Sequence, residues 1–478
     1  MHAAAVSRTD EAPADAWAEL GSSMALLWSN IPSGSALAQA LADTDVATLD
    51  DDECVEFARA VQRQRAWTDR FLVDVTKRFT EHRPGPSDRE HRRWSAPGSE
   101  ERIAPGGDPE QTVGSFAAAE WGPAVGLSTA AARRLIADAL DLTERLGAIR
   151  FLVRLGLCDL ARARMVATAT RDLSRETVAV VQLELLPLLG TLTYHQLRRI
   201  VDRVVARVEP AALEERSAKI RARREVFIDA TYDDHAEVSA TLDATDGKRL
   251  DDRLDGVARQ LGIVQRALGE GAGFGPETES WQQRRARALG LLADPGSLVR
   301  LTRVVSGITH PHSERPREPL EDLVADDARS VPATTLYVHL RGDGTADLEG
   351  LGVLSLPALK ELLSTSAVTV RPVIDLNRPT ASSGYTPSPT VREAMVLTNE
   401  SCVHPYCDRP ARRCESEHTI PYPHGPTASG NLGPECSSHH RVKTHGGWRV
   451  KQPFNGVFVW RAPTGHLYVV DDNGTHPL

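Results

Sequence analysis

The stretch CESEHTIPYPHGPTASGNLGPECSSHH, residues 414–440, gathers two cysteines, four histidines and three glutamates. Two more cysteines, Cys402 and Cys407, precede it in CVHPYC, and Cys436 stands three residues before His439. Zinc binds four sulfur or nitrogen ligands tetrahedrally, and a helix that begins near Cys436 would turn Cys436 and His439 to one side. We therefore predict a structural zinc site formed by Cys402, Cys407, Cys436 and His439.

The same stretch holds polar residues that a structural zinc site does not require. Adjacent residues of a helix point about 100° apart, so His439 can face the cysteines while His440 faces a second centre. Either Cys414 or His404 is an alternative to one of the zinc ligands. The surplus residues are Glu417, His418, Asn431 and His440.

The segments CVHPYC, CESEHTIP, HGPTASGNLGPEC and SSHHRVKTHGGW together resemble the HNH nuclease module with flanking zinc ligands. The resemblance implies a ββα-metal fold, in which a hairpin and a helix surround a divalent ion. It implies that Glu417 and His440 bind this ion, that His418 is the general base, and that Asn431 braces the loop. The family usually has Asp at the position of Glu417, so the ligand here is one methylene longer.

The chemistry expected from this resemblance is hydrolysis of DNA phosphodiester bonds. A divalent ion, Mg²⁺ or Mn²⁺ with Zn²⁺ or Ni²⁺ as alternatives, would neutralise charge that builds up on the phosphate. An ordinary histidine pKa of about 6.5 suits a general base near neutral pH. Nearby cations are candidates for phosphate contacts, namely Arg412, Arg413, Arg441 and Lys443.

The rest of the chain reads as mainly helical over residues 1–305. Apolar positions from Asp50 to Phe79 recur on one helix face, at Phe57, Val61, Leu72, Val75 and Phe79. Ser128 is an expected N-cap, followed by an amphipathic pattern. Residues 82–109 are rich in Pro, Gly, Ser and charge, and predict a flexible insert. Two short strands are expected at 226–229 and 237–242, before a further helix.

Three segments follow this region. Residues 331–376 predict a small α/β element, and residues 377–401 a linker with a short helix over 391–397. Residues 402–470 form the expected HNH domain. Its end contains Asn455-Gly456 between alternating apolar runs, which is typical of a β-hairpin.

The order of these parts is similar to that of actinobacterial HNH proteins with an N-terminal helical domain of unknown function. The similarity includes FAAAEWGPAVGLSTAAARRL and LCDLARARMVATAT ahead of the C-terminal module. It implies a role in recognition or regulation for the helical region, including binding of a protein partner or self-association.

Composition limits the partners. Lys and Arg number 56 against 65 Asp and Glu, a net charge of −9, so a DNA-binding surface must be local. Four of the six cysteines lie near the C-terminus, which favours metal over disulfides. No apolar run is long enough to cross a membrane, and we expect a cytoplasmic protein with no membrane partner.

Two rival hypotheses remain open. One is a non-catalytic, zinc-stabilised DNA-binding protein in which Glu417 is poorly placed for a metal ion. The other is a partner-binding scaffold, in which GLSTAAARRL is a fragment of a helix-turn-helix.

Overall fold

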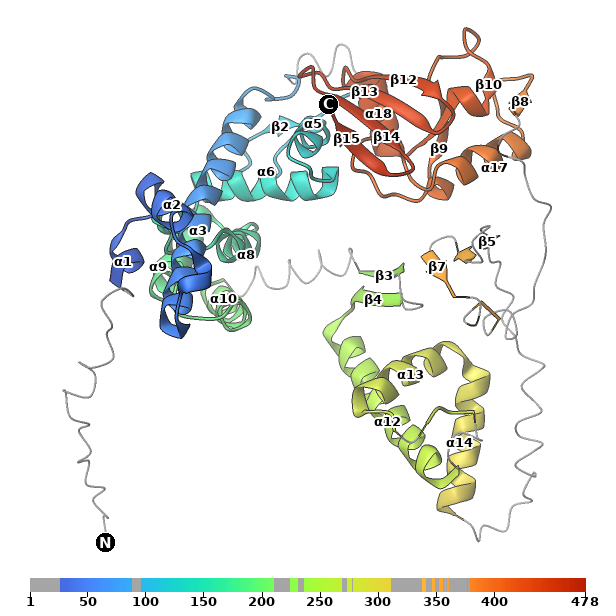
Figure 1. The fold of residues 1–478 in the computed structure, drawn as a ribbon, viewed down its shortest axis with the longest axis horizontal. Coiled ribbons are helices and arrows are strands. Elements are labelled where there is room, and N and C mark those ends of the chain that lie inside the picture. The colour runs from blue at the N-terminus through green and yellow to red at the C-terminus, as the bar shows by residue number, and fades with distance from the viewer. Residues whose placement is uncertain are drawn as a thin grey trace. The chain divides into compact units, whose positions relative to one another are not determined.

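The chain divides into two compact units, one of residues 1–216 with 374–478 and one of residues 217–373. The helices after residue 243 thus leave the unit of the earlier ones, which differs from a single helical domain over 1–305. The structure, a computed structural model (Figure 1), describes residues 26–87, 96–209, 224–230, 236–268, 273–276, 278–310, 338–340, 346–348, 352–355, 357, 359–360, 376 and 379–478.

The first unit begins with a helical region, residues 26–208. Two of its helices start at caps readable in the sequence: Asp50 and Glu53 form a capping box, and Ser128 accepts a hydrogen bond from the backbone of Ala131. None of the described helices is long and apolar enough to cross a membrane. The region contains α1 (Leu26–Asn30), α2 (Ser35–Ala42), α3 (Asp51–Glu81), α5 (Ala117–Ala124), α6 (Thr129–Glu144), α7 (Gly147–Arg154), α8 (Leu160–Thr170), α9 (Arg175–Leu185) and α10 (Tyr194–Val208).

Helix α3 has the expected length, but its buried face is not the one predicted. The buried positions are Ala60, Ala66, Val73, Thr76 and Thr80. The large side chains proposed for the core lie at the edge of this face or outside it; Val61 and Val75 are 39% and 47% exposed. Small residues allow the neighbouring helices to approach α3 closely, so backbone proximity outweighs side-chain size here.

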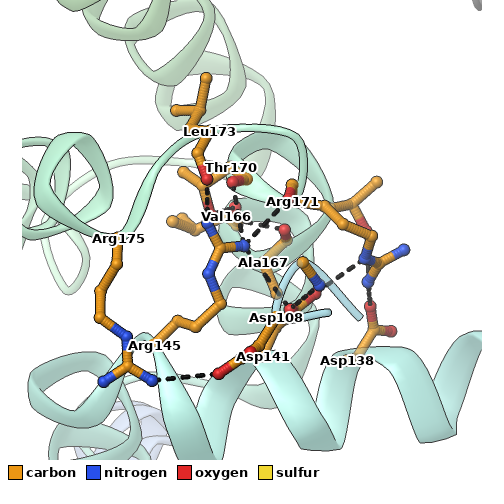
Figure 2. Close-up of polar contacts among 12 residues, drawn as sticks. Asp108, Asp138, Asp141, Arg145, Val166, Ala167, Thr170, Arg171, Leu173 and Arg175 are labelled. Atoms are coloured by element: carbon orange, nitrogen blue, oxygen red, sulfur yellow. Dashed lines mark hydrogen bonds and ion pairs between the residues drawn. The ribbon is translucent and has the colours of Figure 1, made fainter. Parts of the chain in front are cut away.

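A network of buried charges joins the core helices. Arg171, which follows α8, donates to Asp141 at 2.7 Å and to Asp138 at 2.7 Å, and both aspartates lie on α6 (Figure 2). Burial raises the pKa of Asp141, opposed by its hydrogen bonds with the Gly107 backbone and Arg171. Charges this deep require partners, so the network fixes the register of α6 against α8.

The expected flexible insert at 82–109 is ordered over its described residues 82–87 and 96–109. Strand β1 (Arg102–Ile103) pairs with β2 (Val113–Gly114). The Gly107 amide donates to Asp141 at 2.6 Å, and a Cβ at Gly107 would meet the Arg145 guanidinium. A composition poor in apolar residues is therefore compensated by hydrogen bonds to the buried network. Residues 88–95 lie outside the described part of the chain.

The C-terminal module, residues 379–478, is built on a hairpin and a helix. Strand β9 (Glu415–His418) pairs antiparallel with β11 (Leu432–Glu435), with His418 opposite Leu432, and α18 (Ser437–His445) follows. A four-stranded antiparallel sheet closes the chain, formed by β12 (Arg449–Phe454), β13 (Val457–Arg461), β14 (Leu467–Asp471) and β15 (Gly474–Pro477). The hairpin expected at Asn455-Gly456 joins β12 to β13, and the sheet extends past the predicted end at 470.

The segment predicted as a linker, 377–401, belongs to this module over its described residues from 379. Strand β8 (Ala381–Ser382) pairs with β10 (Thr427–Ala428), and α17 (Pro389–Thr398) contains the expected short helix. Val391 and Met395 of α17 pack with Leu432 of β11. The short helix is thus confirmed, and the strand pairing and the apolar contacts of α17 attach this segment to the module.

The module and the helical region share one apolar cluster. Figure 1 shows α5 and α6 beside the C-terminal sheet. Ala119 of α5 packs with Val442, Trp448, Phe458 and Trp460, and Phe116 lies at the edge of the cluster. The two parts therefore fold around a common core within the first unit.

The second unit is described by short strands and three helices. The two expected strands are confirmed as a hairpin, and a three-stranded antiparallel sheet lies within the α/β element predicted at 331–376; the rest of that element, apart from a few positions, lies outside the described residues. The elements are β3 (Glu225–Ala230), β4 (Ala236–Thr241), α12 (Ala244–Leu268), α13 (Trp281–Ala293), α14 (Pro295–Thr309), β5 (Val338–Leu340), β6 (Ala346–Leu348) and β7 (Gly352–Leu354).

Candidate metal centre

The four residues predicted as zinc ligands come together in the folded chain. The ligand atoms of Cys402, Cys407, Cys436 and His439 all lie within 4.8 Å of one another. His439 Nδ1 is 3.5 Å from Cys402 Sγ and 3.3 Å from Cys436 Sγ. A nitrogen and a sulfur on one tetrahedral zinc lie about 3.5 Å apart, from bond lengths of about 2.0 and 2.3 Å. The residues therefore fit a metal ion.

The chemistry of the thiols also fits a metal ion. All three cysteines are free thiols, so no disulfide accounts for their proximity. Hydrogen bonds from Cys402 and Cys407 lower the pKa of Cys436, whereas hydrogen bonding with its neighbours raises the pKa of Cys402. The pKa of Cys407 is likewise raised, to about 12, so Cys436 alone of the three is favoured as a thiolate, the form that binds metal.

The two alternative ligands, Cys414 and His404, do not belong to this group of four. Cys414 is buried beside Cys402, and its thiol donates to the Pro410 carbonyl at 3.4 Å. His404 is completely buried, and its ring stacks on His439 with centroids 3.9 Å apart. Burial lowers the pKa of His404 well below its ordinary value. His404 is therefore a neutral packing partner of the ligand His439.

His440, the residue after His439 on α18, contacts two glutamates of β9. His440 Nε2 is 3.2 Å from Glu417 Oε2, and His440 Nδ1 is 3.0 Å from Glu415 Oε2. Glu415 and Glu417 alternate along β9 and so share one face. Two ligands at right angles on an octahedral ion lie about 3 Å apart, from bond lengths of about 2.1 Å. The Glu417–His440 separation fits a shared cation, while Glu415 anchors the other ring nitrogen.

Lys443 occupies a different position from that expected of a phosphate contact. Its ammonium donates to Glu417 Oε1 at 2.7 Å and to the His418 carbonyl at 2.7 Å, and lies 3.6 Å from Glu435. Burial raises the pKa of Glu435 to about 8, opposed by the charge of Lys443. Glu435 is thus largely protonated at neutral pH, and Lys443 pairs chiefly with Glu417.

His418 has a defined hydrogen-bonding state. It lies at the end of β9, buried, and its Nε2 is 2.9 Å from the Thr427 hydroxyl. That hydroxyl donates to the Tyr385 carbonyl at 3.3 Å, so it accepts a hydrogen bond from His418 Nε2–H. The lone pair therefore resides on Nδ1. Burial lowers the pKa of His418, which keeps the ring neutral at pH 7.

Asn431 closes the loop between β9 and β11. Its Oδ1 accepts from the Ile420 amide at 2.8 Å, and its Nδ2 donates to the carbonyls of Ile420 and Pro426, both at 2.9 Å. Asn431 is buried and makes these contacts inside the loop. It therefore stabilises the loop, as the sequence predicts, without reaching toward Glu417.

Two of the other three cations predicted to contact phosphate form ion pairs or hydrogen bonds within the protein. Arg412 pairs with Glu393 at 2.7 Å, and Arg441 donates to the Gly98 carbonyl at 2.9 Å, while Arg413 is exposed. Sequence reasoning missed Glu415, although its spacing of two from Glu417 on a strand was a usable signal. It also missed Thr427 and Tyr385, which no local pattern connects to His418.

The fold and the site define a helical protein with a Cys₃His cluster that could hold a metal ion, in a C-terminal hairpin-and-helix module. The family model described as a domain of unknown function, DUF222, matches residues 88–397. The match covers more than half of the 478 residues, so the chain belongs to the DUF222 family. It ends before Cys402 and therefore does not reach the metal cluster.

Similar curated proteins come from Mycobacterium tuberculosis. The chain is 31% identical to the uncharacterized protein Rv2100 of strain H37Rv, over 60% of this chain and 55% of the relative. It is 30% identical to the uncharacterized protein Rv3776, over 60% of this chain and 56% of the relative. The chain spans about half the length of the curated relatives it matches. No solved structure matches it.

Proposed function

We propose that this protein is a metal-dependent HNH endonuclease that hydrolyses phosphodiester bonds of DNA. The observation that carries the proposal is the Glu417–His440 pair at 3.2 Å, next in sequence to a histidine whose Nδ1 has no hydrogen-bond partner among the described residues. A structural zinc site behind the same helix would hold that pair in place.

The residues of the chain divide the work of hydrolysis. Glu417 and His440 would hold a divalent ion, which supplies electrostatic stabilisation of the phosphate when bound. Glu415 orients His440 through the opposite ring nitrogen. His418 Nδ1 would accept the proton of the attacking water, because Thr427 holds the proton of the ring on Nε2.

Plasmid nicking tests the proposal. Supercoiled plasmid incubated with the full chain and Mg²⁺ or Mn²⁺ should become nicked, and a chelator should stop the reaction. His418→Ala should slow nicking roughly 100- to 10,000-fold. His440→Ala should abolish metal-dependent nicking. His466 is exposed, so His466→Ala is the matched control and should leave the nicking rate unchanged. Equal rates in all three variants would point to a contaminating nuclease and sink the proposal.

A non-catalytic, zinc-stabilised DNA-binding protein is the second candidate. It is favoured by Lys443, which already neutralises Glu417 at 2.7 Å without a metal ion. In that case the protein binds DNA but does not nick it under any divalent ion. DNA binding measured by mobility shift, in parallel with the nicking assay, separates the two functions.

A further inference from the structure

The imidazole of His439 connects two parts of the chain that are 310 residues apart in sequence. Its Nε2 lies 2.8 Å from the hydroxyl of Thr129, the first residue of α6. Its Nδ1 faces the sulfurs of Cys402 and Cys436. When Nδ1 binds a metal ion, Nε2 carries the proton, so Thr129 accepts a hydrogen bond from the ligand.

This contact is embedded in a wider interface, which makes its geometry specific. His439 is 4% exposed, so Nε2–H has little access to water in place of Thr129. Two residues further along α18, Arg441 donates to the carbonyls of Gly98 and Ser99, at 2.9 and 3.3 Å. Ala119 of α5 and Val442 of α18 both belong to the shared apolar cluster. Residues 96–129 thus form a surface fitted to α18.

We propose that Thr129 is a positioning residue for the metal ligand His439, and that the helical family region thereby completes the Cys₃His centre. Residues 96–129 lie inside the stretch that matches the DUF222 family, so this assigns part of that region a role. Metal binding and the docking of this surface onto α18 are then energetically coupled. The inference rests on metal binding by the cysteine cluster and is independent of nuclease activity.

The expected size of the effect follows from metal sites in general. A partner that holds the distal nitrogen of a ligating histidine typically contributes 10- to 100-fold in metal affinity, because it fixes the ring orientation and the tautomer. Loss of the Thr129 hydroxyl should therefore weaken zinc binding by about that factor. The set of ligands itself should not change.

The experiment uses the full chain and three variants. Thr129→Val removes the hydroxyl at nearly constant shape, and Thr129→Ser restores it. Thr170→Val is the control, because Thr170 is another helical threonine of the same region, buried where Thr129 is half-buried, and its hydroxyl donates to the Val166 carbonyl at 2.9 Å. Zinc affinity is measured by competition with a chromophoric chelator, and Co²⁺ absorption reports the ligand set.

We expect Thr129→Val to bind zinc 10- to 100-fold more weakly with an unchanged Co²⁺ spectrum, and Thr129→Ser and Thr170→Val to match the wild type within about threefold. Thermal unfolding with and without zinc distinguishes weaker zinc binding from a general loss of stability. Thr129→Val should lower the unfolding midpoint more with zinc than without. Wild-type affinity in Thr129→Val, an equal loss in Thr170→Val, or equal shifts in both metal states would overturn the proposal. A wild type that takes up no zinc would overturn it too, whatever the nicking assay shows.

Discussion

Glu417 Oε2 and His440 Nε2 face each other at 3.2 Å, although the first belongs to β9 and the second to α18. A glutamate placed this way should be needed for its charge, because an amide is a far weaker ligand for a hard cation. Glu417→Gln should therefore reduce Mg²⁺- or Mn²⁺-dependent nicking at least about 100-fold, which is typical for loss of one electrostatic contact in an active site. Initial nicking rates as a function of metal concentration measure the effect.

Two further variants show whether the distance or only the charge matters. Glu417→Asp keeps the charge, shortens the side chain to the residue usual in HNH modules, and should retain more activity than Glu417→Gln. Glu415→Gln, which alters only the anchor of His440 Nδ1, should raise the metal concentration needed for half-maximal rate. Full activity in Glu417→Gln would remove this carboxylate from the metal site.

Thr427 should control which nitrogen of His418 carries the proton. Thr427→Val removes the acceptor for Nε2–H, so the free ring should populate both tautomers, and kcat should fall while DNA affinity stays near wild type. Thr427→Ser should rescue the wild-type behaviour. The nitrogen NMR spectrum of labelled histidine gives the tautomer directly, and an unchanged His418 signal in Thr427→Val would refute this assignment.

Local signals in the sequence predicted the elements and the metal cluster well. The capping residues Asp50 and Ser128 start α3 and α6, and the spacing of Cys436 and His439 brought both to one side of α18. These predictions succeed because each depends on residues a few positions apart, whose geometry the backbone dictates.

Contacts between residues far apart in the chain could not be predicted from the sequence. Thr129 and His439 have no pattern in common, and their contact arises only when α5 and α6 pack onto the C-terminal sheet. The core face of α3 was mispredicted for the same reason, since helix approach selected Ala60 and Ala66 over larger apolar residues. Tertiary packing decides such cases, and a single sequence carries no record of it.

Thiol reactivity should reveal the metal cluster without any activity assay. Burial raises the pKa of Cys158 to about 11, while Cys54 is exposed. Cys158 is thus buried and almost entirely protonated at pH 8, so iodoacetamide should modify the exposed Cys54 first. Cys402, Cys407 and Cys436 should be protected with zinc bound and should react after chelation. Mass spectrometry of peptides follows all sites, and chelation without any change at Cys436 would argue against the cluster as a metal site.

The buried charge network should contribute strongly to stability. Arg171→Leu removes the nearest cation of Asp141, whose side chain is 1% exposed, and one of the two cations of Asp138, which keeps Arg164 at 2.6 Å. Breaking a buried pair in this way costs about 3 kcal/mol or more, because Asp141 stays buried with only Arg145, 3.7 Å away, as its remaining cation. Arg175→Leu is the control: Arg175 pairs with Asp108 at 3.1 Å, but its side chain is 63% exposed, so the change should stay within about 0.5 kcal/mol. Urea unfolding of both variants measures the difference. Equal stability of the two would mean that Asp141 takes up a proton and tolerates the loss, since burial already raises the pKa of Asp141. The pH dependence of the unfolding free energy tests this explanation. A protonated Asp141 is stabilising below its ordinary pKa, and this contribution disappears as the pH rises through the raised pKa.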